Sequence, residues 1–405
     1  MSDYRPPFIR RVILRNYKSI QECDVNLGPF MLLVGPNGSG KSNFLDALRF
    51  VTDSLRNNID QALRERGGIK EVRRRSRGHP NHFSIQLEIN LPDQTDASYC
   101  FRVGARQEGR FEIQEEVCSI TNKNNGGQIG YQVVNGKVKK SDFPHPPPAS
   151  TDRLYLTNAA GFPEFRGLYD ALMGMGFYNI NPDRLRDLQE PDAGNLLLRD
   201  GRNLTSVLSW IERNNKQVKE RIEEYMGSIV SGIKHVDKRS LGPKETLEFK
   251  QTVAGDDNPW SFSSQNMSDG TLRALGVLVS LFQSFDRQGE SPIPLVGIEE
   301  PEATLHPAAT AALMGALHEA SHFTQVLATS HSPDLVDGLE LSPDMLLVVD
   351  AQGGETKIGP ADDTSKSILV DRLYTAGELL KQNMLKPQPK PVEPEEIFPL
   401  FPTET

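Results

Sequence analysis

Cysteine and long apolar runs are both scarce in this chain of 405 residues. Its three cysteines, Cys23, Cys100 and Cys118, are far apart and form no Cys-x-x-Cys pair. This excludes a disulfide framework and a cysteine metal cluster, and it is typical of a reducing compartment. No run approaches the roughly 20 apolar residues that span a bilayer, and the polar N-terminus lacks the apolar core of a secretory signal. We therefore expect a cytoplasmic protein with no membrane partner.

Positive charge is also in short supply. The chain has 45 Lys and Arg against 54 Asp and Glu, a formal net charge of −9. This balance excludes an overall basic surface for nucleic acid, although a local basic groove stays open. The densest basic run contains Arg73, Arg74, Arg75 and Arg77. It is either a solvated surface segment or a set of contacts to DNA phosphates.

What the chain does contain is the octapeptide Gly-Pro-Asn-Gly-Ser-Gly-Lys-Ser at residues 35–42, which matches G-x-x-x-x-G-K-[ST]. The apolar run 30–34 before it predicts a buried strand, and residues 43–51 after it have helical periodicity. A glycine-rich turn between strand and helix directs backbone N–H groups at a polyphosphate. We expect a nucleoside triphosphate here, with Lys41 at the β- and γ-phosphates and Ser42 on Mg²⁺. The residues predicted to bind it are Asn37, Gly38, Ser39, Gly40, Lys41, Ser42 and Asn43.

Two adjacent acids follow a second apolar run. Residues 294–298 predict a buried strand that ends at Glu299 and Glu300. A carboxylate at a strand end can hold Mg²⁺, and a second one can orient or deprotonate an attacking water. We assign Glu299 to the metal and Glu300 to the water.

Two further segments in the last third of the chain each have two interpretations. Ser268 and Gly270 precede the apolar helical run 272–282. They form either an ordinary helix N-cap or a second anion-binding helix N-terminus. His331 follows a predicted strand at 324–329. It is either structural or a hydrogen-bond partner of the γ-phosphate or of the attacking water.

The remaining pattern predicts a mixed fold. Strands are expected at 82–91, 98–104, 110–120 and 129–134, with an exposed loop over 137–150. Helices are expected at 165–175 and from about 204 to 230, where apolar residues recur at helical spacing.

As an ordered set, these motifs resemble the ATP-binding-cassette (ABC) ATPases of the SMC/RecF/OLD branch. The resemblance is greatest to compact AAA-type ATPases of bacterial defence loci, whose SDGTLR and EEPE…LHP motifs match residues 268–273 and 299–307. It is strong over residues 8–52 and 262–340, and looser at 177–179 and 196–204.

The resemblance implies roles that the residues alone leave open. It makes 267–271 the signature motif, His331 the switch histidine, and 301–306 a loop that touches a second subunit. It places Lys18 and Ser19 near the base or the phosphates. It also implies ATP with Mg²⁺, held in a homodimer or a higher even oligomer. In such an assembly the phosphate loop of one copy and Ser268 of another share each γ-phosphate.

The implied fold class is α/β. It is an ABC-type P-loop ATPase head with an inserted antiparallel β lobe and a helical lobe, and without a long coiled coil. Residues 1–55 and 241–385 would form the two parts of the ATPase core. The inserted lobe would comprise 56–150, the helical lobe 151–240, and a proline-rich extended tail 386–405.

The sequence departs from the family pattern in two places. No glutamine stands where the Q-loop belongs, near 177–186, so Asn179 or Asn181 would replace it. The residues after Asp350 are too few for the metal-dependent nuclease domain that OLD proteins carry. We therefore expect any nucleic-acid cleavage to belong to a separate protein.

Three functions follow from this reading. The first is a regulatory ATPase that controls a separately encoded effector, such as a nuclease or toxin, in bacterial anti-phage defence. The alternative is a DNA-binding repair ATPase of the RecF type, in which the arginine run contacts DNA. A transporter subunit is disfavoured, because a β-rich segment separates the phosphate loop from the signature motif.

Overall fold

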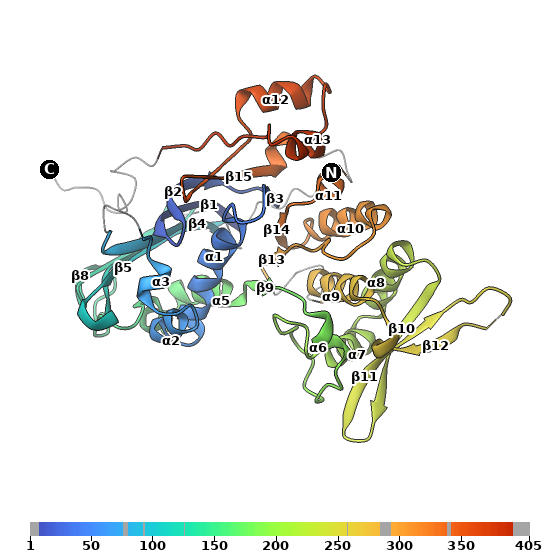
Figure 1. Ribbon diagram of the computed structural model, residues 1–405. Coiled ribbons are helices and arrows are strands. Elements are labelled where there is room, and N and C mark those ends of the chain that lie inside the picture. The colour runs from blue at the N-terminus through green and yellow to red at the C-terminus, as the bar shows by residue number, and fades with distance from the viewer. Residues whose placement is uncertain are drawn as a thin grey trace.

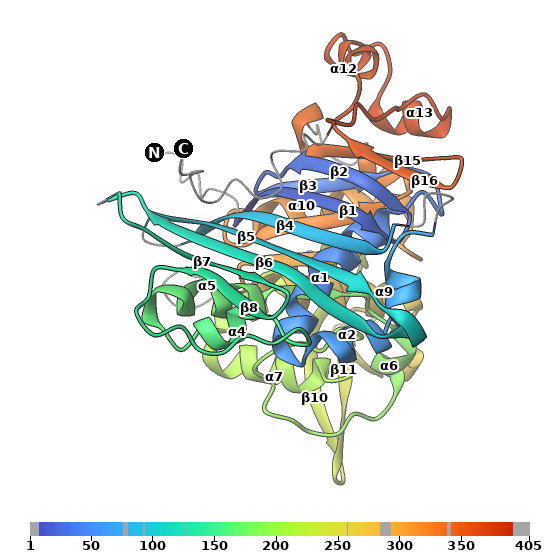
Figure 2. The ribbon, with the colours of Figure 1, turned by 90° about the vertical axis from the view of Figure 1, so that its left-hand side faces the viewer.

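The chain, seen here as a computed structural model, is described over residues 8–75, 80–91, 94–124, 126–256, 258–283, 293–337 and 342–391. Within these ranges, thirteen strands form one large sheet and three form a smaller one (Figures 1 and 2). The strands of the large sheet are, in spatial order, β8 (Lys137–Ser141), β7 (Gln128–Val134), β6 (Phe111–Asn122), β5 (Thr95–Ala105), β4 (His82–Leu91), β1 (Ile9–Tyr17), β2 (Ile20–Asn26), β16 (Glu355–Gly359), β15 (Leu346–Gln352), β3 (Phe30–Val34), β14 (Gln325–Ser330), β13 (Leu295–Glu299) and β9 (Gly176–Tyr178).

The centre of the large sheet is parallel. Strand β3 pairs in parallel with β14 and β15, and β13 pairs in parallel with β14 and β9. The strands from β2 to β8 form an antiparallel ladder beside this centre. A parallel sheet is covered on both faces, which explains why every residue of β3 is apolar and buried. The carboxyl ends of β3, β13 and β14 therefore meet at one edge.

Helices cover both faces of the sheet. One face packs against α1 (Lys41–Arg56), α2 (Ile59–Arg64), α3 (Ile69–Val72), α4 (Leu156–Ala159) and α5 (Pro163–Gly174). The other packs against α9 (Asp269–Phe282) and α10 (Pro307–Ala320), and the same apolar core continues into α6 (Pro182–Arg186), α7 (Leu204–Asn214), α8 (Lys216–Ile229), α11 (Pro333–Val336), α12 (Asp363–Val370) and α13 (Ala376–Lys381). Short 3₁₀ turns lie at Gln107–Gly109, Ser264–Asn266 and Pro343–Met345.

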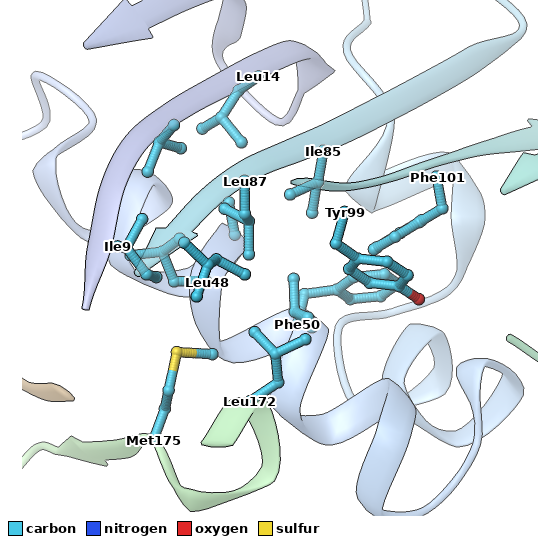
Figure 3. Close-up of a cluster of buried hydrophobic side chains, with 14 of the residues drawn as sticks. Ile9, Leu14, Leu48, Phe50, Ile85, Leu87, Tyr99, Phe101, Leu172 and Met175 are labelled. Carbon is cyan, nitrogen blue, oxygen red and sulfur yellow. The ribbon is translucent and has the colours of Figure 1, made fainter. Parts of the chain in front are cut away.

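The apolar core between the sheet and helices α1 to α5 fixes α1, the helix that follows the phosphate loop. Figure 3 shows Leu48 and Phe50 of α1 facing the strand residues Leu87 and Phe101. The ring of Phe50 also lies 5.4 Å from that of Phe83, edge to face. Because α1 is held by packing along its length, its N-terminus is held in place at the carboxyl end of β3.

The predicted α/β fold class is confirmed. Strands β4 to β7 match the strands expected over 82–134, and they extend the main sheet as one continuous ladder. Among the described residues the longest helix is α1, with 16 residues, so no long coiled coil is seen there. Within the same ranges, none of the helices combines the length and apolar composition that a bilayer crossing requires.

The prediction of one helix from about 204 to 230 is wrong at Asn215. The backbone leaves the helical region there, with φ −149° and ψ 81°. The Asn215 side chain then accepts a hydrogen bond from the N–H of Val218 at 3.3 Å and caps α8. An asparagine at such a point favours a cap over a continuous helix, because its side chain competes for backbone N–H groups.

Two further elements differ from the sequence expectations. The first residues of the expected 137–150 loop form β8, which pairs with β7. A separate sheet of β10 (Ile233–Leu241), β11 (Lys244–Gln251) and β12 (Trp260–Ser263) projects from the molecule beside α7 (Figure 1). It crosses the predicted boundary at residue 240.

Of the expected tail, residues 386–391 lie along the body, where Lys390 pairs with Asp24 at 3.0 Å. Residues 392–405 are outside the described ranges.

A buried carboxylate joins the antiparallel ladder to the helices that follow it. Glu116 of β6 is 1% exposed. Its oxygens accept hydrogen bonds from the hydroxyls of Tyr99 (3.1 Å) and Tyr131 (2.8 Å), and from the backbone N–H groups of Tyr155 (2.5 Å) and Leu156 (2.8 Å). Burial raises the pKa of Glu116, and these donors oppose that rise.

Replacing this carboxylate should be strongly destabilising. Glu116→Ala leaves four buried donors without an acceptor, so we expect the free energy of unfolding to fall by about 3–5 kcal/mol. Urea unfolding at neutral pH measures this loss. Glu115→Ala is the control on the same strand, since Glu115 bonds to the half-buried Gln132 side chain and should cost about 1 kcal/mol or less. Equal losses in the two variants would contradict the anchoring role.

Candidate functional site

The phosphate loop has the donors that a polyphosphate requires. Gly40 is the N-cap of α1 with φ 106°, and as a glycine it offers no side-chain cap to the first N–H groups of that helix. Lys41 is 5% exposed, and its Nζ donates to the carbonyls of Gly35 (2.8 Å) and Pro36 (3.0 Å). Among the described residues the buried Ser39 hydroxyl has no hydrogen-bond partner. A cation bound only by carbonyls, an unpaired hydroxyl and an uncapped helix N-terminus fit an anion.

Acidic side chains act on this lysine. Burial lowers the pKa of Lys41, while the negative charges of Glu300 and then Glu302 raise it. Both acids follow β13 in the chain, and β13 is separated from β3 in the sheet by β14. The sheet thus brings the predicted phosphate loop and the predicted acid pair to one edge.

Glu300 is held in an unusual backbone conformation. Its φ is 45°, in the left-handed region that non-glycine residues rarely adopt, at a cost of about 1–3 kcal/mol. Its N–H donates to the carbonyl of Thr329 at 3.1 Å, which ties the turn to the end of β14. Its Oε1 lies 3.1 Å from Nδ1 of His331. The structure therefore pairs the two residues that the sequence predicts to be catalytic.

The predicted metal ligand Glu299 has a partner that sequence reasoning missed. Oε1 of Glu299 accepts a hydrogen bond from Nη2 of Arg199 at 3.0 Å. Arg199 lies in the segment before α7, and its carbonyl accepts from the N–H of Asn179 at 3.0 Å. The side chain of Asn181, the other Q-loop candidate, caps α6 by accepting from the N–H of Asp183. The looser family match at 196–204 was the signal that could have drawn attention to Arg199.

A third acid completes this edge. Glu302 is 6% exposed, and its Oε1 accepts a hydrogen bond from the Ser330 hydroxyl at 2.5 Å. Its Oε2 is buried and has no partner among the described residues. Burial raises the pKa of Glu302, against the hydrogen bond from Ser330. Glu302 thereby joins the 301–306 loop to the residue that precedes His331.

In the signature segment, Ser268 acts as an N-cap within this chain. Its hydroxyl accepts from the N–H of Thr271 at 3.2 Å and lies 2.8 Å from the Thr271 hydroxyl. These bonds stay within one turn, and no described residue of the chain's own phosphate loop takes part in them. A Cβ on Gly270 would lie 2.6 Å from the carbonyl oxygen of Thr304. The glycine therefore allows the 301–306 loop to pack on the first turn of α9.

The structure places Lys18 and Ser19 beside α1. Nζ of Lys18 lies 2.6 Å from a carboxylate oxygen of Asp46. The Ser19 hydroxyl accepts a hydrogen bond from Nδ2 of Asn43 at 2.6 Å. The side chains of Lys18, Ser19 and Asn43 are thus engaged with other protein groups next to the phosphate loop.

Most of the described arginine run is used inside the molecule. Arg74 is 8% exposed and donates to the carbonyl of Ser19 at 2.7 Å. Arg73 donates to the carbonyl of Pro80 at 2.9 Å. Arg75 is exposed and pairs with Glu71. Arg77 lies outside the described residues.

Two family models match the chain in succession. The model described as "AAA ATPase domain" matches residues 8–130. The model described as "AAA domain, putative AbiEii toxin, Type IV TA system" matches residues 163–337. Between them they cover the phosphate loop, the signature segment, the acid pair and His331.

Two relatives match over most of the chain. The OLD nuclease of Thermus scotoductus is 22% identical over 353 residues, which are 81% of this chain and 60% of the relative. The endonuclease GajA of Bacillus cereus is 24% identical over 358 residues, which are 80% of this chain and 55% of the relative. The chain is an ATPase that is similar to the ATPases of the SMC/RecF/OLD type. This ATPase spans little more than half the length of either relative.

A solved structure has the same fold as this ATPase. The head domain of an SMC protein bound to the C-winged-helix domain of ScpA matches with a TM-score of 0.55 and 16% identity, over 89% of this chain and 99% of that one. The likeness confirms an SMC-head fold, as the ordered motifs predicted.

The ion pairs of Asp46 with Lys18 and Arg66 predict how the stability of the fold depends on pH. Burial alone would raise the pKa of Asp46, but Arg66 and then Lys18 reverse this and lower it to about 2, from an ordinary value of 3.8. A carboxyl with a lowered folded-state pKa stabilises the fold above its unfolded pKa, and this contribution is lost as the pH falls toward the folded one. We expect Asp46 to contribute about 2 kcal/mol at neutral pH, lost mostly between pH 4 and pH 2.

Urea unfolding from pH 5 down to pH 3 measures this contribution. Asp46→Asn should lower stability at pH 5 and flatten its decline toward pH 3. Asp60→Asn is the control, because Asp60 pairs with the exposed Arg64 and should change stability by less than about 1 kcal/mol. An unchanged slope in Asp46→Asn would contradict this account.

Proposed function

We propose that this ATPase binds ATP through the backbone N–H groups of residues 37–43, with Lys41 on the β- and γ-phosphates. Ser42 and Glu299 would hold Mg²⁺, since Mg²⁺ takes oxygen ligands and commonly one or two from protein. The observation that carries the proposal is the uncapped N-terminus of α1 beside a buried lysine whose partners, among the described residues, are the carbonyls of Gly35 and Pro36. Lys41 would exchange these carbonyls for phosphate oxygens.

The residues at the carboxyl ends of the strands would have separate roles in ATP hydrolysis. Bound Mg²⁺ would supply charge compensation for the phosphate oxygens. Glu300 would orient the attacking water and accept its proton, a contribution of about 10²–10⁴ in rate. His331, 3.1 Å from Glu300, would hold that carboxylate in position. Arg199 would turn away from Glu299 when that carboxylate takes up the metal.

The signature segment supports a shared site. Ser268 bonds within its own turn, and the α9 N-terminus lies against the 301–306 loop of the same chain. We infer a head-to-tail homodimer, or a higher even oligomer, in which Ser268 and Gly270 of one copy face the phosphate loop of another. A second helix N-terminus would then add donors to the γ-phosphate, which a single loop cannot surround.

The biological role that we propose is control of a separately encoded effector, such as a nuclease or toxin, in anti-phage defence. The names of the relatives and of the family model support it, since they include nucleases and a toxin system. A RecF-type role in DNA repair is less well supported. Arg73 and Arg74 of the proposed DNA contact bond to backbone carbonyls of this chain.

Two substitutions test the catalytic roles. Glu300→Gln should bind ATP, release phosphate about 10²–10⁴ times more slowly, and form a dimer when ATP is present. Lys41→Ala should bind no ATP and stay in its nucleotide-free assembly state. Phosphate release and light scattering with and without ATP provide both measurements. Glu164→Gln, an exposed change on α5, serves as the control and should behave as the unmodified chain.

A Glu300→Gln protein that hydrolyses ATP at the normal rate and stays monomeric would overturn both the catalytic assignment and the shared site. The effector is tested separately by purifying Glu300→Gln with ATP from cells that carry the native gene neighbourhood. A co-purifying nuclease or toxin is the expected result. Its absence, with an ATP-dependent dimer present, would overturn the effector role alone.

A further inference from the structure

The hairpin of β15 and β16 closes over the back of the phosphate loop. Thr356 of β16 is 1% exposed, and its hydroxyl donates to the carbonyl of Ser39 at 2.7 Å. A Cβ on Gly40 would lie only 2.2 Å from the Thr356 hydroxyl oxygen, and one on Gly35 only 1.9 Å from the carbonyl oxygen of Val349. Two glycines of the nucleotide motif are therefore required by the hairpin as well as by the turn.

The Thr356 hydroxyl has a second neighbour on the opposite side. It lies 2.7 Å from the hydroxyl of Ser19, which in turn accepts from Nδ2 of Asn43 at 2.6 Å. The backbone N–H of Thr356 also donates to the carbonyl of Ser19 at 3.0 Å. The two hydroxyls thus lie between Ser39 and Asn43, the residues on either side of the Gly40–Ser42 segment.

The available protons fix the direction of these bonds. Each hydroxyl has one proton, and that of Thr356 is donated to the carbonyl of Ser39. The shared hydrogen between the hydroxyls must therefore come from Ser19. The bonds run from the Asn43 amide to Ser19, from Ser19 to Thr356, and from Thr356 to Ser39. Such an ordered chain is cooperative and leaves its members little freedom to turn.

We propose that Thr356 is a positioning residue for nucleotide binding. With Ser19 and Asn43 it holds both flanks of the Gly40–Ser42 segment, so that the backbone N–H groups converge before ATP arrives. Holding a binding loop in its bound conformation raises affinity by lowering the ordering cost of binding. The inference rests on ATP binding at this loop, as proposed above. It gives Ser19 and the side chain of Asn43 a supporting role, without direct contact to the nucleotide.

Removal of the hydroxyl alone tests the proposal. Thr356→Val keeps the shape of the side chain, and we expect the dissociation constant for ATP to rise about tenfold, or about 1.4 kcal/mol. The KM should rise by a similar factor while kcat stays within about twofold. Thr356→Ser keeps the hydroxyl and should bind ATP within about threefold of the unmodified chain. Titration calorimetry with Mg-ATP, together with steady-state kinetics, measures these values.

A matched control separates positioning from loss of any buried hydroxyl. Thr324 is 5% exposed and donates to the carbonyl of Ile293 at the same distance, 2.7 Å. It directly precedes β14, at the end of that strand away from the candidate site. Thr324→Val should lower thermal stability as much as Thr356→Val and leave ATP affinity unchanged. Amide hydrogen exchange in the nucleotide-free protein should be faster over residues 39–43 in Thr356→Val alone.

A double-mutant cycle gives the second test. Ser19→Ala breaks the same chain of hydrogen bonds, so the loss of affinity in Ser19→Ala with Thr356→Val should be clearly smaller than the sum of the two single losses. Three results would each overturn the proposal: normal ATP affinity in Thr356→Val, an equal loss of ATP affinity in Thr356→Val and Thr324→Val, or additive losses of ATP affinity in the cycle. If the unmodified chain itself bound no ATP, the proposed function would fail first.

Discussion

The parallel pairing of β3 with β14, and of β14 with β13, is the constraint on which the candidate site depends. Parallel neighbours end at the same edge, so residues far apart in the chain follow their strands into one region. The phosphate loop leaves β3, the acid pair leaves β13, and His331 leaves β14. Apolar side chains on both faces fix these strands between two cores. At the edge, hydrogen bonds and ion pairs hold the polar side chains, such as Glu300 with His331 and Glu299 with Arg199.

The candidate residues that sequence reasoning proposed are those whose signal is local. A glycine-rich motif between a strand and a helix, and paired acids at a strand end, are recognisable because a few adjacent positions contain all the information. The partners of these residues have no such signal. Arg199 meets Glu299 from the segment before α7, and Thr356 meets Ser39 from the far end of the chain. A lone threonine at position 356 looks like any other in the sequence, and near Arg199 the one signal is the looser family match at 196–204.

Charge pattern proved a weaker guide than apolar pattern. The arginine run was open to two interpretations, a solvated segment or a set of DNA contacts, and in the structure Arg74 is buried and Arg73 bonds to a backbone carbonyl. Sequence composition cannot distinguish a solvated arginine from one that satisfies carbonyls inside a fold. The break at Asn215 has a similar cause, because the apolar spacing on both sides is helical and the side-chain cap ends one helix and begins the next. Apolar periodicity located the elements, whereas polar side chains set their ends.

In the proposed mechanism, the left-handed backbone at Glu300 places activity and stability in opposition. Glycine would adopt that conformation without steric cost, and its N–H could still donate to Thr329. A chain selected only for a stable fold would therefore favour glycine at this position. Glutamate there sacrifices some conformational stability to present a carboxylate to His331. The number of other destabilising mutations that the chain tolerates would then depend on how much the two apolar cores add to its free energy of unfolding.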